Sequence, residues 1–392
     1  MNVPKLRFKE FTDEWNYTCL SEISAEITYG MNSASTEFDG LNKYIRITDI
    51  DDETGNFKPS NLVSPLNKPE DKFLVKKDDI LFARTGASTG KTYLYNIKDG
   101  KLYFAGFLIK AHIVNHNSNF IFQQTKLEKY KKWVKLTSMR SGQPGINSEE
   151  YGKCVFSITS LSEENKIAQF LSLLDKKIEL QTKKIEALKL FKKGLLNSFF
   201  QNKQPNVTIE NCISYGKAGG TPSSKNKDYY DGNIPFLSIS DMTSQKKYIL
   251  KTEKSISQQG IKNSSAWIVP KNSIILSMYA SYGLIAINKI ELATSQAMFS
   301  MIVNSKNNIE YIYYYLEFLY NNSYYDRLVS IGTQANLNAD KVKKIKIYLP
   351  DINSQNQISK ILKLCDERIE YENKKEFELR KFKQGLLQNL FI

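Results

Sequence analysis

The chain contains few of the residues on which metal sites, disulfides and acid–base catalysts depend. Of its 392 residues, two are histidine and four are cysteine. The cysteines, at positions 19, 154, 212 and 365, lie far apart and form no C-x-x-C pair. This spacing argues against a zinc ribbon or a redox pair, and a reducing cytoplasm is the expected location. Histidine-based catalysis has little support.

Long apolar segments are also missing. The longest uncharged run, 272–288, is short for a membrane span and contains several serines, two tyrosines and a glycine. We predict two strands around a turn there. The first ten residues, MNVPKLRFKE, carry charges where a signal peptide needs an apolar stretch. We therefore expect no membrane partner and no secretion by that route.

The rest of the composition is that of a folded protein with excess positive charge. Hydrophobic residues make up 41% and aromatic residues 12%, with only 10 prolines and 19 glycines, which excludes a disordered or collagen-like chain. The length predicts two or more domains. A net charge of +14 favours polyanions such as nucleic acid or an anionic membrane, and charge alone does not choose between them.

An internal repeat is the most informative pattern. The segment from Ser162 to Phe200 recurs in outline 191 residues later without a gap, so that Ile167 matches Ile358 and Gly194 matches Gly385. In the first copy, apolar residues step by alternating fours and threes, which predicts a coiled-coil helix of about 35 residues. The second copy places Glu372 and Glu376 in this seam. An ordinary bundle of amphipathic helices is the alternative.

The segments before each helix correspond as well. YIRITD and FLSISD each end at an aspartate, Asp49 and Asp241, and the turn 87–90 parallels the turn 280–283. Runs such as DDILFAR and NSIILSM predict a mostly β core. A helix is expected around 120–135, with a basic face, and another around 308–328, with an aromatic face that is more often core than a stacking platform.

Several apparent catalytic motifs fail on spacing. GASTGKT at 86–92 has three residues between its glycines where a phosphate loop needs four, so a hairpin turn is favoured. His112 and His116 would bind one metal only on a helix, yet their surroundings predict a strand. The sequence therefore points to binding rather than catalysis.

The order of these segments resembles the specificity (S) subunits of type I restriction-modification systems. GGTPSSKNKDYYDGNIPFLSISDM at 219–242 is similar to the family's opening segment, KDDILFARTGASTGKTYL to its hairpin, and SGQPGINSEEY before an IAxFL helix to its domain-to-helix junction. The resemblance covers essentially the whole chain. TSLSEEN at the junction departs from the family's usual Pro-Pro-Leu and Glu-Gln.

The resemblance implies an α+β fold with an internal pseudo-twofold repeat. Two mixed, mostly β target-recognition domains would be joined by two long helices that form an antiparallel coiled coil. The expected boundaries are 1–155 for the first recognition domain, 156–200 for the central helix, 201–348 for the second recognition domain and 349–392 for the C-terminal helix.

It also implies a subunit that performs no chemistry itself. Such a chain would read a bipartite, asymmetric sequence in double-stranded DNA, one half with each domain. Two methyltransferase (modification) subunits would supply adenine-N6 methylation with S-adenosylmethionine, and two restriction motor-nuclease subunits would supply restriction with ATP and magnesium. No catalytic residue, metal or cofactor is expected on this chain.

Side chains that can pair with base edges are the candidate DNA contacts. In the first unit these are Arg46, Arg84, Lys91, Arg140 and Gln143. In the second they are Thr221, Ser223, Lys225, Lys227, Tyr279, Tyr282, Gln334 and Asn336. Gln143 and Gln334 recur in both units, which leaves a structural role open for them.

Two other classes of function stay open at this stage. A non-catalytic coiled-coil scaffold that binds only protein would show no salt-dependent affinity for DNA. A phosphate-loop-like nucleotide hydrolase would depend on Lys91.

Overall fold

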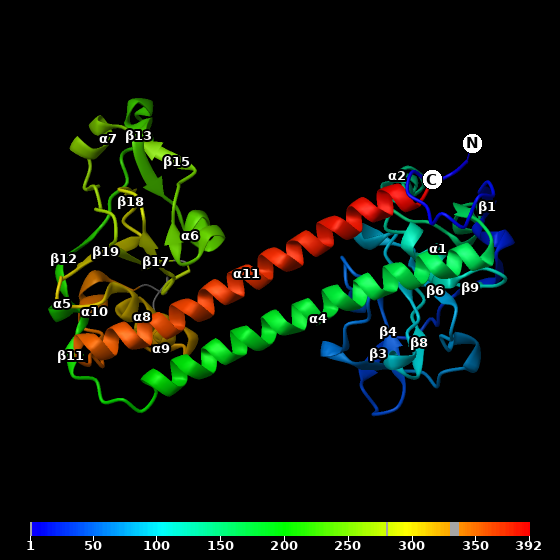
Figure 1. Cartoon of the computed structure of the whole chain (residues 1–392), viewed down its shortest axis with the longest axis horizontal. Helices are drawn as coiled ribbons and strands as arrows, with labels where there is room; N and C mark the ends of the chain where they lie inside the picture. The colour runs from blue at the N-terminus through cyan, green and yellow to red at the C-terminus, as the bar shows by residue number, and fades with distance from the viewer. Residues whose placement is uncertain (1, 280, 330–336) are drawn as a thin grey trace. The chain divides into compact units, whose positions relative to one another are not determined.

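The computed structural model describes residues 2–279, 281–329 and 337–392. The chain divides into two compact units (Figure 1). Unit 1 comprises Met1–Thr182 and Lys375–Ile392, and unit 2 comprises Lys183–Lys374. Across the described ranges, no helix is both long and apolar enough to cross a lipid bilayer. Gln334 and Asn336, two of the expected DNA contacts, lie outside the described residues.

Unit 1 is built on a four-stranded antiparallel sheet in the order β2 (Ser24–Tyr29), β9 (Leu108–Ile113), β6 (Asp79–Ala83) and β7 (Thr92–Leu94). Every residue of β6 is buried. Ile80 and Phe82 face one apolar cluster, and Leu81 and Ala83 face another, as the two-residue period of a strand requires. The sheet therefore has a core on both faces.

Smaller pairs complete unit 1. β1 (Asn16–Cys19) pairs with β10 (Val155–Ile158), β3 (Ser35–Glu37) with β5 (Val63–Pro65), and β4 (Lys43–Ile45) runs parallel to β8 (Leu102–Phe104). The helices before the long one are α1 (Ser118–Gln124), α2 (Glu128–Thr137) and α3 (Ser148–Gly152).

Unit 2 repeats this plan. Its main sheet has the order β12 (Ile213–Ala218), β19 (Met298–Val303), β16 (Ile274–Ser277), β17 (Ile285–Asn288) and β14 (Tyr248–Ile249). The central strand again serves two clusters, with Ile274 and Leu276 on one side and Ile275 on the other. The parallel pair recurs as β13 (Tyr230–Leu237) with β18 (Ala293–Thr294).

The remaining elements of unit 2 are short. They are β15 (Lys254–Ile256), which pairs with β13, β11 (Val207–Thr208), which pairs with β20 (Lys346–Ile347), and the helices α5 (Ile209–Cys212), α6 (Ile239–Gln245), α7 (Gln258–Lys262), α8 (Ile309–Asn321), α9 (Tyr324–Leu328) and α10 (Ala339–Lys343).

Two long helices, α4 (Leu161–Phe200) and α11 (Ile352–Leu390), each contribute one half to each unit. In unit 1, Thr182 donates to Glu376 at 2.6 Å and Asp175 lies 2.5 Å from Lys383. In unit 2, Lys184 lies 2.7 Å from Glu372, and Lys192 lies 2.6 Å from Asp366. Because residue numbers rise along one helix as they fall along the other, the helices run antiparallel within each unit.

The first part of the seam predicted from the fours and threes is buried, since Ile167, Leu171, Leu174, Ile178 and Ile185 are all among the buried apolar residues. Its last part is only half-buried, at Leu188, Leu195 and Phe199. On the opposite seam, Glu372 is buried and Glu376 is half-buried. The interior of the helix pair therefore includes a carboxylate among its apolar residues.

Each of the single helices expected before the long ones is two helices. In the first unit the break falls between α1 and α2, where the Thr125 hydroxyl donates to the Phe122 carbonyl at 2.7 Å and ends the first helix. In the second, Ser323 between α8 and α9 has a left-handed backbone with φ +52°, which a continuous helix does not allow. Most aromatic residues of α8 are core, as expected, since Tyr311, Tyr313, Tyr314 and Tyr315 are buried, whereas Tyr320 is exposed.

Candidate nucleic-acid interface

The β6–β7 turn of unit 1 is fixed by main-chain hydrogen bonds to two other loops. The Arg84 amide donates to the Phe107 carbonyl at 3.1 Å, and the Arg84 carbonyl accepts from Ile146 at 2.9 Å. The Gly86 amide donates to Pro144 at 2.9 Å. The turn is therefore a hairpin, as the spacing of GASTGKT predicts, and it is held against residues 144–146.

Arg84 and Gln143 lie at this turn. The Arg84 guanidinium stacks over the Tyr29 ring at 4.9 Å, and its buried Nε has no hydrogen-bond partner among the described residues. Tyr29 in turn accepts hydrogen bonds from the amide and hydroxyl of Ser148 at 3.1 Å. The exposed Gln143 side chain passes so close to Gly86 that a Cβ there would lie 3.0 Å from its Nε2. Two of the five predicted contacts are thus brought together.

The other three predicted contacts of unit 1 are engaged in ion pairs. Arg46 forms a two-pronged pair with Asp49 at 2.9 Å. Lys91 lies 2.5 Å from Asp52, and Arg140 lies 2.5 Å from Glu150. A phosphate or a base would have to compete with these carboxylates, so the three cations are less available than their sequence positions suggest.

The two main-chain hydrogen bonds made by Arg84, which we call the backbone frame, recur in unit 2 with different side chains. Met278 donates to the Ala297 carbonyl at 2.7 Å and accepts from Leu337 at 3.0 Å, as Arg84 does with Phe107 and Ile146. At equivalent places, unit 1 therefore presents a stacked arginine and a largely exposed phenylalanine, Phe107. Unit 2 presents a buried methionine and an alanine.

The predicted contacts of unit 2 lie on two loops. Tyr279 and Tyr282 are on the β16–β17 turn, and Tyr282 donates to Asp326 at 2.9 Å. Thr221 donates to Gln296 at 2.5 Å. The remaining three, on the loop that follows β12, are exposed: Ser223, Lys225 and Lys227.

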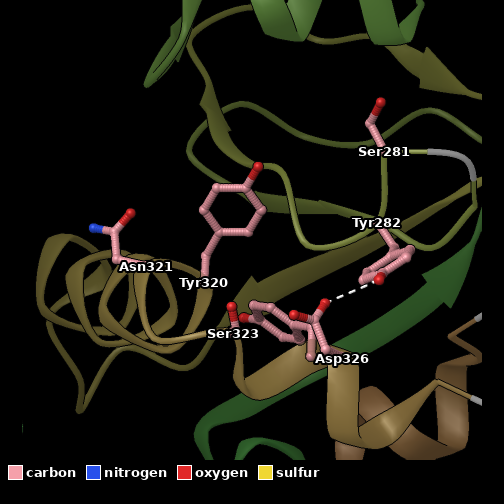
Figure 2. Close-up of a pocket in the computed structure, with 7 residues that line it drawn as sticks. Ser281, Tyr282, Tyr320, Asn321, Ser323 and Asp326 are labelled. Atoms are coloured by element: carbon pink, nitrogen blue, oxygen red, sulfur yellow. Dashed lines mark hydrogen bonds between the residues drawn. The ribbon is translucent and has the colours of Figure 1, made fainter. Parts of the chain in front are cut away.

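A hollow of about 510 Å³ lies beside the β16–β17 turn (Figure 2). It is lined by Ser281, Tyr282, Tyr320, Asn321, Ser323, Tyr325 and Asp326. The turn packs closely against the ring of Tyr325, because a Cβ on Gly283 would lie 2.7 Å from that ring. The φ of Gly283 is +83°, which also favours glycine at this position. The hydrogen bond to Asp326, followed by burial, raises the pKa of Tyr282. The hydroxyl therefore stays protonated at neutral pH and donates a hydrogen bond to the carboxylate.

Sequence reasoning missed Phe107 and Asp326. Phe107 looks like an ordinary core residue of a strand, and its neighbour Arg84 is distant in sequence. Asp326 does carry a signal, because the residue 191 positions earlier is the exposed Lys135. A reversal of charge between equivalent positions of a repeat marks a place where the two units differ in what they contact.

The histidines do not meet at a metal. His112 lies 2.7 Å from Asp79, and His116 lies 2.8 Å from Glu164. Within the described parts of the chain, no cluster of three or more histidine, cysteine or acidic side chains could hold an ion. Each histidine therefore has its own carboxylate partner, and the strand around His112 is β9, as predicted.

Both units attach to the long helices through the same contact. In unit 1 the Asn117 side chain donates to Asn165 at 2.7 Å, and in unit 2 Asn308 donates to Asn356 at 2.7 Å. Asn117 and Asn308 also begin α1 and α8 by accepting from the third residue of each helix. The junction is conserved in geometry between the two halves of the chain.

Comparison with known proteins identifies relatives along most of the chain. A family model described as the type I restriction modification DNA specificity domain matches residues 12–190 and 206–381. The MjaIX specificity subunit of Methanocaldococcus jannaschii is 31% identical over 44% of this chain and 40% of that protein. The HindI specificity subunit of Haemophilus influenzae is 33% identical over 34% of this chain and 29% of that protein.

The chain covers less than half of the length of these two relatives. A match to another relative extends over nearly the whole of both proteins. The putative MjaX specificity subunit of M. jannaschii is 23% identical over 99% of this chain and 95% of that protein. The crystal structure of a type I restriction-modification S subunit from M. genitalium shares the fold, with a TM-score of 0.61, 16% identity, and coverage of 100% of this chain and 99% of that one.

Proposed function

This chain belongs to the type I restriction-modification DNA specificity family, and from that premise we propose that it reads a bipartite, asymmetric sequence in double-stranded DNA. Unit 1 reads one half-site and unit 2 the other. The observation that carries this proposal is the repeated backbone frame with different side chains: Arg84 and Phe107 stand where unit 2 has Met278 and Ala297. Two units with one frame and different surfaces are suited to two different half-sites.

The chemistry of modification and restriction is proposed to belong to partners. Lys91, on which the alternative of a nucleotide hydrolase depends, is paired with Asp52 beside a hairpin turn. Methyltransferase subunits would supply S-adenosylmethionine-dependent adenine-N6 methylation, and restriction motor-nuclease subunits would use ATP and magnesium. The chain itself would choose the DNA site at which they act, in the cytoplasm, where its four free cysteines stay reduced.

Exposed apolar side chains on the long helices support the proposed two methyltransferase subunits. Each unit carries one set, and the members of one set stand 191 residues from those of the other. In unit 1 the set is Leu161, Phe170, Leu173, Leu180 and Phe382, and in unit 2 it is Ile352, Ile361, Leu364, Tyr371 and Phe191. The exposed Leu190 and Phe377 have no apolar counterpart. Exposed apolar residues in a repeated arrangement are typical of a docking surface, and two equivalent sets fit two copies of one partner.

The proposal is tested by methylome sequencing in cells that carry the full chain and its methyltransferase partners. Methylated adenines should fall in one bipartite sequence and should disappear without the chain. The purified chain should bind DNA in a strongly salt-dependent manner, because phosphate contacts release counterions. Methylation that is unchanged without the chain, or DNA affinity independent of salt, would instead favour a protein-only scaffold.

A further inference from the structure

The hollow at the β16–β17 turn has the composition of a base-reading site. It is lined by the aromatic rings of Tyr320 and the buried Tyr325 and by the polar residues Ser281, Asn321 and Asp326. Figure 2 shows the hydrogen bond between Tyr282 and Asp326. Its volume of about 510 Å³ lies in the range of pockets that receive small ligands. The turn that forms one side corresponds to the β6–β7 turn of unit 1, which begins at Arg84 and which the Gln143 side chain approaches at Gly86. The hollow therefore borders the part of unit 2 that corresponds to two candidate contacts of unit 1.

The Asp326 carboxylate lines the hollow and keeps acceptor capacity beyond its hydrogen bond with Tyr282. Tyr282 donates to Oδ1 at 2.9 Å, and the residue is exposed. A carboxylate offers about four lone-pair directions and no proton, so the remaining capacity can be filled only by a donor. Against DNA, a carboxylate is repelled by phosphates and by the acceptor atoms of bases. It is favourable only where a base amino group donates a hydrogen bond to it.

The repeat shows that this acid is specific to unit 2. The turn glycine, Gly283, packs on Tyr325, as Gly90 of unit 1 packs on Val134, where a Cβ would lie 2.5 Å away. The next residue after each packing partner is Asp326 in unit 2 and Lys135 in unit 1. The packing is therefore retained while the charge at the rim is reversed, as expected if this position contributes to the difference between the half-sites.

We propose that the hollow receives the major-groove edge of a cytosine, whose N4 amino group donates to Asp326 while Tyr282 holds the carboxylate in place. Cytosine presents an amino donor there, whereas adenine adds the N7 acceptor beside its amino group and guanine presents two acceptors. A carboxylate therefore selects cytosine. Asp326 is the specificity-determining residue, and Tyr282 is a positioning residue. The inference rests on the proposed function, since it assigns one base of the second half-site.

The test is selection of randomised DNA duplexes by the full chain in complex with its methyltransferase partners, followed by sequencing. The wild-type complex should enrich cytosine at one position of one half-site. In Asp326→Asn the enrichment of cytosine at this position should fall about tenfold or more, which is the discrimination that one good base contact provides. The preferred base should shift toward adenine, because asparagine pairs with adenine. Tyr282→Phe should weaken the same preference without changing the base.

Asp340→Asn, in α10 and outside the hollow, is the matched control because it removes the same charge from an exposed position, and its preferences should equal those of the wild type. Thermal unfolding of each variant should match the wild type, which shows that folding is intact. Asp326→Asn with unchanged base preferences, or with a change in both half-sites, would overturn the inference and leave the proposed function standing. A wild-type complex that enriches no sequence would overturn the proposed function itself.

Discussion

The ammonium of Lys184 lies 2.7 Å from the carboxylate of Glu372, and the Glu372 side chain is almost wholly buried in the seam between α4 and α11. Arg368, one turn before Glu372, lies at the same distance from it. Both cations are about half exposed, so the buried charge is neutralised from the solvent side. A buried polar residue in a helix seam can fix register at a cost in stability.

Glu372→Leu should therefore leave the chain equally stable or more stable by about 1 kcal/mol, because an apolar side chain of similar size replaces a desolvated charge. Glu372→Ala should destabilise it by about 1–2 kcal/mol, because the seam then contains a cavity. Urea unfolding measures both differences. Glu370→Leu, at an exposed position of the same helix, should change little. If Glu372→Leu were as damaging as Glu372→Ala, the carboxylate would be required for stability rather than for register.

Arg84→Met places in unit 1 the residue that unit 2 has at the equivalent backbone position. The frame should tolerate it, because Met278 makes the same main-chain hydrogen bonds. We expect a loss of about 1–3 kcal/mol of discrimination at one base pair of one half-site, the contribution of one good base contact. Methylome sequencing of the variant checks this. A change in both half-sites would show that unit 1 does not recognise one half-site independently of unit 2.

Leu173→Glu in unit 1 and Leu364→Glu in unit 2 should each remove one copy of the methyltransferase partner. A charge in an apolar interface is costly to desolvate, and each leucine belongs to only one of the two exposed sets. Native mass spectrometry should show two bound copies for the wild type, one for each single variant and none for the double variant. Ser198→Glu, at an exposed position of α4 outside both sets, should retain two. Loss of both copies from one single variant would mean that the partners bind jointly.

Lys126 should make unit 1 more stable at alkaline pH. Burial, and then the nearby Lys383, lower the pKa of Lys126 to about 8, and its Nζ lies over the Phe122 ring at 4.4 Å. Below pH 8 both the folded and the unfolded chain are protonated, and the cost of burying the charge is present in full. Between about pH 8 and the usual lysine pKa near 10.4, the unfolded chain binds more protons, so stability rises with pH.

Lys126→Met should abolish this rise, which we expect to be on the order of 1–3 kcal/mol. Subtracting its urea-unfolding curve from the wild-type curve at each pH isolates the contribution of Lys126 from those of other groups. Lys132→Met, an exposed lysine of α2, serves as the control and should keep the rise. Parallel curves for the wild type and Lys126→Met would show that the amine is solvated.

The sequence predicted the long helices and the hairpins well, because their patterns are local or repeat at a constant spacing, whereas the breaks between α1 and α2 and between α8 and α9 were not predicted. Ile167 and Ile358 stand at one constant offset, and the β6–β7 turn follows directly from its glycines. The recognition surface was less accessible to prediction. Arg84 corresponds to Met278 and Phe107 to Ala297 only through main-chain hydrogen bonds, and loop insertions shift these pairs away from the constant offset.

Ion pairs account for another part of what could not be predicted. Arg46, Lys91 and Arg140 have the right chemistry for DNA, yet each has a carboxylate partner that folding brings close. The partner of Lys91, Asp52, lies in a separate loop, so spacing alone gives no sign of it. Tyr282 was predicted as a contact, and Asp326 differs in charge from Lys135 at the equivalent position, but their proximity follows only from the packing of α9 beside the turn.

In both units the backbone holds the turn in place while the side chains differ, and this separation has an evolutionary consequence. Main-chain hydrogen bonds at Arg84 and Met278 do not depend on the side chain attached, so substitution of Arg84 leaves them in place, whereas a substitution of the buried Met278 must also fit the core around it. A lineage carrying such a chain could change one half of its recognised sequence by a few substitutions while the other half and the helix contacts stay as they were. New specificity would then arise in single steps, each of which leaves a folded protein.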